Sequence, residues 1–134
     1  MLALLAWLCA SVHAADAPRL ELRELSLDNG LRVVVHEDHA APVVALQLLV
    51  QAGAADDPPG HAGALHLREH ALFTGCRAAP GQGLDLALAE VGGDANAWTH
   101  YDRLLFSTVV PPGALERALF LDADRLGWPT LDPE

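Results

Sequence analysis

The sequence predicts an α+β fold in which a mixed or antiparallel sheet packs against helices. Segments that alternate apolar and polar residues lie near the start of the chain, and this is the period of a half-buried strand. Later segments place apolar residues three and four positions apart, which is typical of amphipathic helices. Of the 134 residues, 51% are apolar and 19% are charged, so the chain can bury the core of one domain.

The charge balance limits the classes of partner. Acidic residues outnumber basic residues by 18 to 8, the formal net charge is −10, and every basic residue is Arg. These Arg residues form no cluster, whereas neutralising phosphate groups requires clustered positive charge. We therefore expect no binding to nucleic acid and no adsorption to an anionic membrane surface.

The first residues predict a secretory signal peptide, residues 1–14. Leu2–Ala10 is an apolar run too short to span a bilayer, and the small residues expected at a cleavage site follow it. A buried N-terminal strand or helix is the alternative, since no Lys or Arg precedes the run. After cleavage the chain would be periplasmic or secreted and without a membrane span. It would keep only Cys76, which excludes an intrachain disulfide.

Three strands are predicted before the first helix. The alternating stretch from Arg19 to Leu27 is followed by Asp28-Asn29-Gly30, which is typical of a hairpin turn because Asn and Gly tolerate positive φ. Residues 31–35 would form the returning strand. Val43–Val50 is nearly all apolar, so we expect a central strand buried on both faces.

Three helices and one more strand are predicted in the rest of the chain. The expected helices span residues 62–74, 84–91 and 114–126, and the expected strand spans residues 104–110. Gly75 and the Gly92-Gly93 pair would end the first two helices. A sheet made of these strands alone keeps an exposed edge, so we expect the isolated chain to associate or aggregate through it.

The most informative stretch is His66-Leu67-Arg68-Glu69-His70. Residues four apart on a helix share a face, so the imidazoles of His66 and His70 can reach one ion. Zinc binds neutral imidazole nitrogens, and a catalytic zinc keeps one position open for water. Glu69 is placed to take a proton from that water. The alternative is a surface helix whose His and Glu side chains only face solvent.

Several collinear motifs resemble the pitrilysin/insulinase family of zinc metallopeptidases, which includes the mitochondrial processing peptidases. Residues 27–35, LDNGLRVVV, are similar to the family's first hairpin, and residues 42–53 to its next strand. Residues 63–75, GALHLREHALFTG, resemble its zinc-binding helix with the inverted H-x-x-E-H motif. Residues 92–99, GGDANAWT, resemble its Gly-Gly…Asn-Ala-x-Thr segment. The resemblance covers nearly everything after the predicted signal peptide.

The resemblance implies a fold and a set of roles. Residues 15–134 would be the N-terminal portion of a pitrilysin-like metallopeptidase domain, an incomplete half-domain with the fold of the mitochondrial processing peptidases. His66 and His70 would bind zinc, and Glu69 would be the general base of peptide-bond hydrolysis. The implied substrate is a peptide or small unfolded protein, enclosed between this lobe and a second lobe or homologous subunit.

A second pair of residues is assigned on the same ground. Asn96 and Ala97 fall where the family positions the substrate backbone near the metal. For Asn96 the residues themselves leave an alternative open, because an Asn after Gly-Gly also suits a turn or a cap.

Two His side chains do not complete a catalytic zinc site, which usually takes three protein ligands and water. In the family the third ligand is a Glu about 75 residues beyond the second His, so we expect it after Glu134 and the domain to be truncated before it. No spacing recommends a substitute among His61, Glu90, Asp94 and His100. We therefore expect weak or no activity from these 134 residues alone. The alternative function is non-catalytic binding of a peptide or partner by a degenerate subunit.

Overall fold

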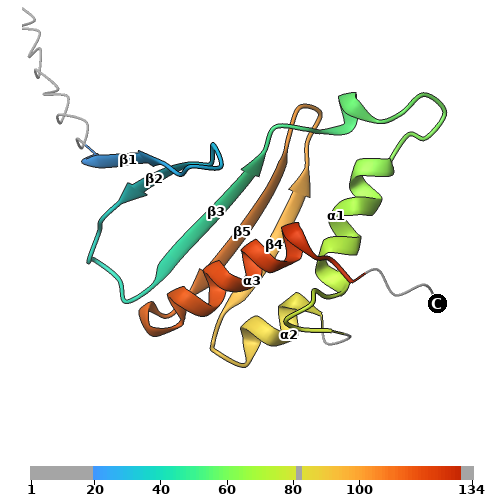
Figure 1. Cartoon of the computed structure of the whole chain (residues 1–134). Coiled ribbons are helices and arrows are strands. Elements are labelled where there is room, and N and C mark those ends of the chain that lie inside the picture. The colour runs from blue at the N-terminus through green and yellow to red at the C-terminus, as the bar shows by residue number, and fades with distance from the viewer. Residues whose placement is uncertain (1–19, 81–82, 131–134) are drawn as a thin grey trace, which may run out of the picture. The chain divides into compact units, whose positions relative to one another are not determined.

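The computed structural model describes residues 20–80 and 83–130 (Figure 1). The predicted signal peptide, residues 1–14, lies outside the described residues. The chain divides into two compact units, residues 1–39 and residues 40–134.

The first unit contains a β-hairpin. Strand β1 (Leu22–Ser26) pairs antiparallel with β2 (Arg32–His36). The turn places Gly30 at a φ of 85°, which favours glycine, and the Asn29 side chain accepts a hydrogen bond of 3.1 Å from the Leu31 N–H. The hairpin predicted from the Asp-Asn-Gly turn is confirmed.

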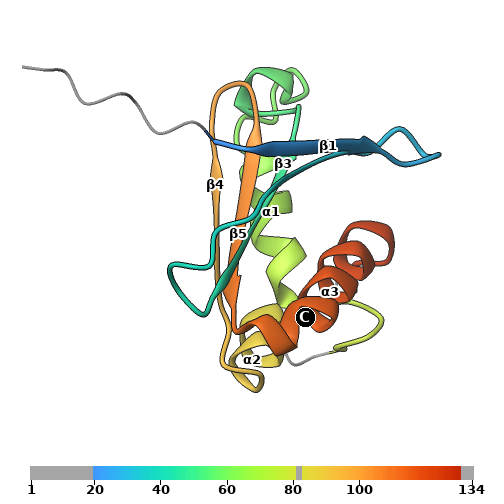
Figure 2. The ribbon, with the colours of Figure 1, turned by 90° about the vertical axis from the view of Figure 1, so that its left-hand side faces the viewer.

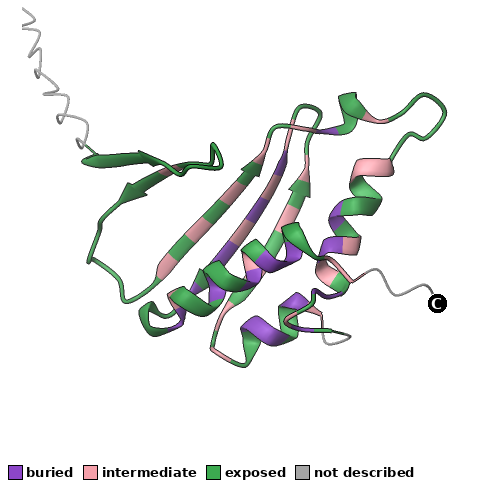
Figure 3. Ribbon diagram, in the orientation of Figure 1, coloured by how far each residue is buried: buried purple, intermediate pink, exposed green. Residues whose placement is uncertain are grey.

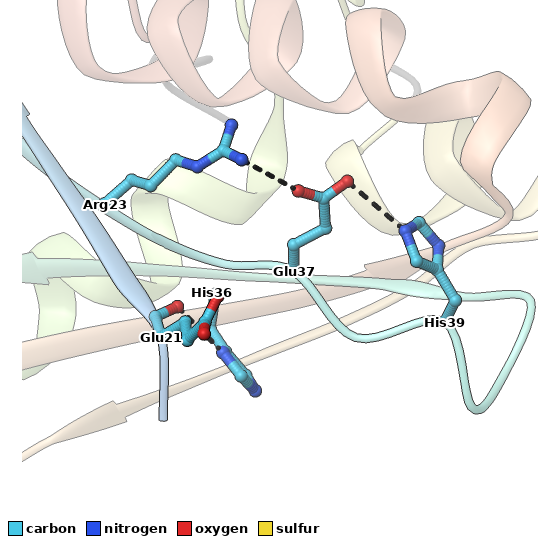
Figure 4. Close-up of polar contacts among 5 residues, drawn as sticks. All are labelled: Glu21, Arg23, His36, Glu37 and His39. Carbon is cyan, nitrogen blue, oxygen red and sulfur yellow. Dashed lines mark hydrogen bonds and ion pairs between the residues drawn. The ribbon is translucent and has the colours of Figure 1, made fainter. Parts of the chain in front are cut away.

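Polar side chains gather at the end of the hairpin opposite its turn (Figure 4). The Glu37 carboxylate lies 3.6 Å from Arg23 Nη2 and 3.2 Å from His39 Nε2. His36 Nδ1 lies 3.2 Å from the backbone oxygen of Glu21. All of these side chains are exposed, so each pair contributes little to stability.

The second unit is built on a three-stranded antiparallel sheet in the order β3-β5-β4 (Figure 1). Strand β5 (Leu104–Val110) lies in the middle and pairs with β3 (Val44–Val50) on one side and β4 (Asp94–Thr99) on the other. Alternate side chains of β5, from Leu104 to Val110, are buried. The sheet therefore has one covered face.

The prediction that Val43–Val50 is a central strand buried on both faces is wrong. Within the described residues, β3 pairs only with β5, and Leu49 on its open face is 51% exposed. An all-apolar run places apolar side chains on both faces, so it does not show whether the second face is covered. Association through an unpaired strand edge stays a prediction.

Strand β4 was not expected from the sequence. Its Asp, Ala and Asn residues are depleted in strands, and the two glycines before it signal a stop. The strand forms because its backbone pairs with β5 along its whole length, from Asp94 opposite Val109 to Thr99 opposite Leu104. Asn96 lies inside this strand, so the alternative that it serves a turn or a cap is wrong.

Three helices lie on the same side of the sheet (Figure 1 and Figure 2). They are α1 (Ala64–Thr74), α2 (Leu84–Ala89) and α3 (Leu115–Gly127), with the short 3₁₀ helices η1 (Ala54–Asp56) and η2 (Pro112–Ala114). The three predicted helices and the α+β class are confirmed. No helix in the described ranges combines the length and apolar character needed to cross a bilayer.

The core lies between the helices and the covered face of the sheet (Figure 3). Its buried residues include Leu121 of α3 and Phe106 of β5. Helix α3 also buries Arg125, which is 1% exposed. The Arg125 guanidinium lies 2.6 Å from Asp122 Oδ1 and 4.4 Å from the centre of the Phe106 ring. Burial lowers the pKa of Arg125 and raises that of Asp122.

Asp124 ties α3 to the loop between α1 and α2. Its Oδ1 accepts a hydrogen bond of 3.0 Å from Arg77 Nη2, and its Oδ2 accepts one of 2.7 Å from the Ala78 N–H. Burial alone would raise the pKa of Asp124, but the hydrogen bonds from Ala78 and Cys76 and the charge of Arg77 outweigh it and lower the pKa. The Asp124 carboxylate is therefore charged, and in this form it holds the loop.

Candidate functional site

Helix α1 carries the H-x-x-E-H motif, and Asp57 fixes where the helix begins. Asp57 Oδ2 accepts a hydrogen bond of 2.6 Å from the Gly63 N–H, and Oδ1 accepts one of 2.9 Å from the Leu65 N–H. These two N–H groups would otherwise lack partners at the start of the helix. The same hydrogen bonds lower the pKa of Asp57. Gly63, at a φ of 90°, lets the chain turn into the helix.

The two motif histidines converge. His66 Nε2 and His70 Nε2 lie 3.0 Å apart, and the imidazole rings are stacked with their centres 4.8 Å apart. Two imidazole nitrogens on one tetrahedral zinc ion would lie about 3.3 Å apart. The separation of the two nitrogens is therefore within a few tenths of an ångström of that in a shared zinc site.

Glu69 is held by a contact from outside the helix. Its side chain is buried, with 8% of the residue exposed, and its Oε2 accepts a hydrogen bond of 2.5 Å from Thr99 Oγ1. Thr99 is the last residue of β4. The alternative of a helix whose His and Glu side chains only face solvent is wrong for Glu69, because a tertiary contact holds it.

Helix α1 and strand β4 form the two walls of a cleft of about 420 Å³. The lining residues are His66, Glu69, His70, Asn96, Ala97, Trp98, Thr99 and His100. The structure thus brings together all five predicted site residues, although they come from segments about 30 positions apart. Asn96 Oδ1 accepts a hydrogen bond of 2.8 Å from the Ala97 N–H.

Of the four possible substitute ligands named from the sequence, only one lies in the cleft. His100 lines the cleft, whereas His61 is exposed in the loop before α1, with its Nδ1 3.2 Å from the Pro59 oxygen. Glu90 follows α2, and Asp94 begins β4. Across residues 20–80 and 83–130, no three His, Cys, Asp or Glu side chains gather closely enough to hold a metal ion. A two-histidine pair is what the described residues offer.

Sequence reasoning assigned no role to Thr99. The residue stands in the quoted Asn-Ala-x-Thr segment, but its contact with Glu69 spans 30 positions and joins a helix to a strand that was not predicted.

Comparisons with known proteins give consistent results. A family model described as "Insulinase (Peptidase family M16)" matches residues 32–134. The insulin-degrading enzyme of Drosophila melanogaster is 36% identical over 100 residues, which cover 74% of this chain and 10% of that protein. The zinc protease PqqE of Helicobacter pylori is 29% identical over 126 residues, which cover 92% of this chain and 28% of that protein.

A solved structure has the same fold. The crystal structure of pitrilysin superposes with a TM-score of 0.78 at 30% sequence identity, and the match covers 92% of this chain and 13% of that one. This chain therefore spans from 10% to 28% of the length of these relatives.

Proposed function

Because the chain belongs to the insulinase family of peptidases, peptidase family M16, we propose that it forms part of the catalytic lobe of a zinc-dependent endopeptidase. The observation that carries the proposal is the cleft, where two converging imidazoles lie beside a buried carboxylate. The relative PqqE of Helicobacter pylori is a zinc protease, which supports zinc as the metal.

His66 and His70 would hold the zinc ion through their Nε2 atoms. When bound, zinc supplies Lewis acidity and lowers the pKa of water towards neutrality. Glu69, on the wall of the same cleft, accepts the proton of the attacking water and returns it to the leaving amine. Thr99 fixes one oxygen of that carboxylate. A third protein ligand would complete the site, since catalytic zinc sites usually have three.

Asn96 and Ala97 would position the substrate. They lie on β4, which pairs on one side with β5 and has no other strand partner within the described residues. The free edge of a strand can pair with an extended peptide through backbone hydrogen bonds. A peptide or small unfolded protein fits this edge, and a second lobe or homologous subunit would enclose it.

We also propose that the protein is exported. Removal of residues 1–14 as a signal peptide would place it in the periplasm or outside the cell. Sequencing the N-terminus of the protein from its native source tests this, since export by this route predicts that the mature chain begins at Ala15.

The decisive variant for the reaction is Glu69→Gln. The full-length variant should keep near one zinc ion per chain after dialysis but lose about 10²- to 10⁴-fold in the rate of peptide hydrolysis, because the amide cannot accept the proton. Zinc content and cleavage of a quenched fluorescent peptide measure the two effects. Glu90→Gln, at an exposed position after α2, is the matched control and should change neither.

Two results would contradict the proposal. Hydrolysis that persists in Glu69→Gln would remove the general base from the mechanism. A full-length wild-type protein that retains no zinc would favour non-catalytic binding of a peptide or partner.

A further inference from the structure

Glu69 is placed where it can reach the metal. It lies three positions after His66 on α1, and side chains three apart on a helix are neighbours. Zinc accepts carboxylate oxygens as readily as imidazole nitrogens. A free Glu69 side chain would therefore compete for the position that a catalytic site keeps open. The structure shows instead that Glu69 does not group with the two histidines.

The hydrogen bond from Thr99 explains this separation. At 2.5 Å it has the length of a hydroxyl bound to a carboxylate, and such charge-assisted bonds are about twice as strong as neutral ones. It is the single hydrogen bond that the Glu69 carboxylate accepts within the described residues. Because Glu69 is almost fully buried, losing this donor would leave a buried oxygen without a partner.

The donor itself stands on a rigid support. Thr99 pairs with Leu104 at the end of the β4–β5 ladder, and the His100 N–H donates to the Arg103 oxygen at 2.8 Å in the turn that follows. The Ala54 N–H donates to the His100 oxygen at 3.0 Å, which ties this turn to η1. Gly53 completes the contact, because a Cβ there would lie 2.4 Å from the Arg103 nitrogen. These contacts fix the position of the backbone that carries the hydroxyl.

We propose that Thr99 is a positioning residue that holds the Glu69 carboxylate on the cleft wall and keeps it from ligating the metal at His66 and His70. The inference rests on the proposed function. A carboxylate that donates its lone pair to a metal is no longer free to accept a proton, and it occupies the site of the attacking water. The hydrogen bond from the Thr99 hydroxyl thus keeps the Glu69 carboxylate available as a general base.

Metal affinity tests the proposal without measuring turnover. Co²⁺ serves as a coloured substitute for zinc in the full-length protein, and its absorption spectrum reports the ligand set. Thr99→Val is close to isosteric and removes only the hydroxyl. It should bind Co²⁺ more tightly than wild type and shift the spectrum, because the freed Glu69 carboxylate would add an oxygen ligand. We expect a gain of about tenfold, the lower end of the change in affinity that outer-shell partners cause, but in the opposite direction to the usual loss. Thr99→Ser keeps the hydroxyl and should match wild type.

Two further variants isolate the cause. In Thr99→Val/Glu69→Gln the gain in affinity and the spectral shift should both disappear, because the amide is a poor ligand. Thr74→Val removes a hydroxyl from the same helix at a site that bonds to the Ala71 and Thr130 backbone oxygens, and it should leave Co²⁺ binding unchanged.

Each other outcome overturns the inference. Thr99→Val with the affinity and spectrum of wild type would show that Glu69 stays in place without the hydroxyl. If Thr99→Val and Thr99→Ser lose Co²⁺ binding equally, Thr99 serves only the structure of strand β4 and its hydroxyl does not position Glu69. If wild type and every variant fail to bind Co²⁺, the proposed function fails with it, whereas wild-type binding without a Thr99 effect leaves the proposed function standing.

Discussion

Charged side chains are buried in two regions of the second unit, and they are compensated in different ways. In the α3 cluster, formed by Asp122, Asp124, Arg125 and the neighbouring Arg77, each charge faces an opposite charge of the same chain. In the cleft, the buried Glu69 carboxylate accepts one hydrogen bond and faces no Arg within the described residues. The paired charges of the α3 cluster stabilise the fold, whereas the Glu69 carboxylate has no counter-charge and can still accept a proton.

The largest expected effect lies in the α3 cluster. Arg125→Ala should lower the free energy of unfolding by about 3–5 kcal/mol, because it leaves the mostly buried Asp122 without its counter-charge. Replacing both, as Arg125→Met with Asp122→Leu, should be neutral or stabilise by up to about 4 kcal/mol. The Nε and Nη1 atoms of Arg125 have no hydrogen-bond partner among the described residues, so the pair is poorly compensated.

Urea unfolding measures both free energies. A double variant as unstable as Arg125→Ala would show that the ion pair itself is required. Metal content should stay at the wild-type level in the double variant. A loss of metal in this variant would show that the cleft depends on the α3 cluster.

Acid should weaken the fold through the structural carboxylates. The pKa values of Asp57 and Asp124 are both lowered from the ordinary 3.8 in the folded state, by hydrogen bonds at the start of α1 and in the α3 cluster. Their contribution to stability is therefore complete above that value and is lost as the pH falls through the lower folded pKa. Asp57→Asn and Asp124→Asn should each lower the melting temperature near neutrality, and each difference from wild type should shrink as the pH falls through the lowered pKa of that carboxyl group. Melting curves that stay parallel at every pH would contradict this.

The smallest effect is expected in the hairpin. Arg32 Nη2 lies 2.8 Å from Glu24 Oε2, as close as the ion pairs of the α3 cluster, but both side chains are more than half exposed. A double-mutant cycle with Arg32→Ala and Glu24→Ala should give a coupling energy below about 1 kcal/mol that vanishes in 1 M salt. A larger coupling would mean that distance matters more than burial in this protein.

Local patterns carried most of the successful sequence predictions. The Asp-Asn-Gly turn and the H-x-x-E-H helix depend on residues within one turn of each other, so their geometry follows from the backbone alone. The family resemblance then added Asn96 and Ala97, which do line the cleft. Their assigned roles remain predictions.

Non-local contacts account for what was missed. Strand β4 has a composition that opposes a strand and forms because β5 lies beside it. Whether a face of β3 is buried or exposed depends on the elements that pack against it, and an apolar run does not encode these. The Thr99 contact with Glu69 depends on both the helix and the strand, so no spacing in the sequence signals it.

The two contacts of this site differ in how much of the chain each one requires. His66 and His70 are four residues apart and can meet as soon as one turn of α1 exists, so an ion bridging them would favour the costly nucleation of that helix. Thr99 meets Glu69 only after a loop of 30 residues has closed and the β4–β5 ladder has formed. The arrangement of the histidines is therefore encoded locally, whereas the restraint on Glu69 requires the tertiary fold.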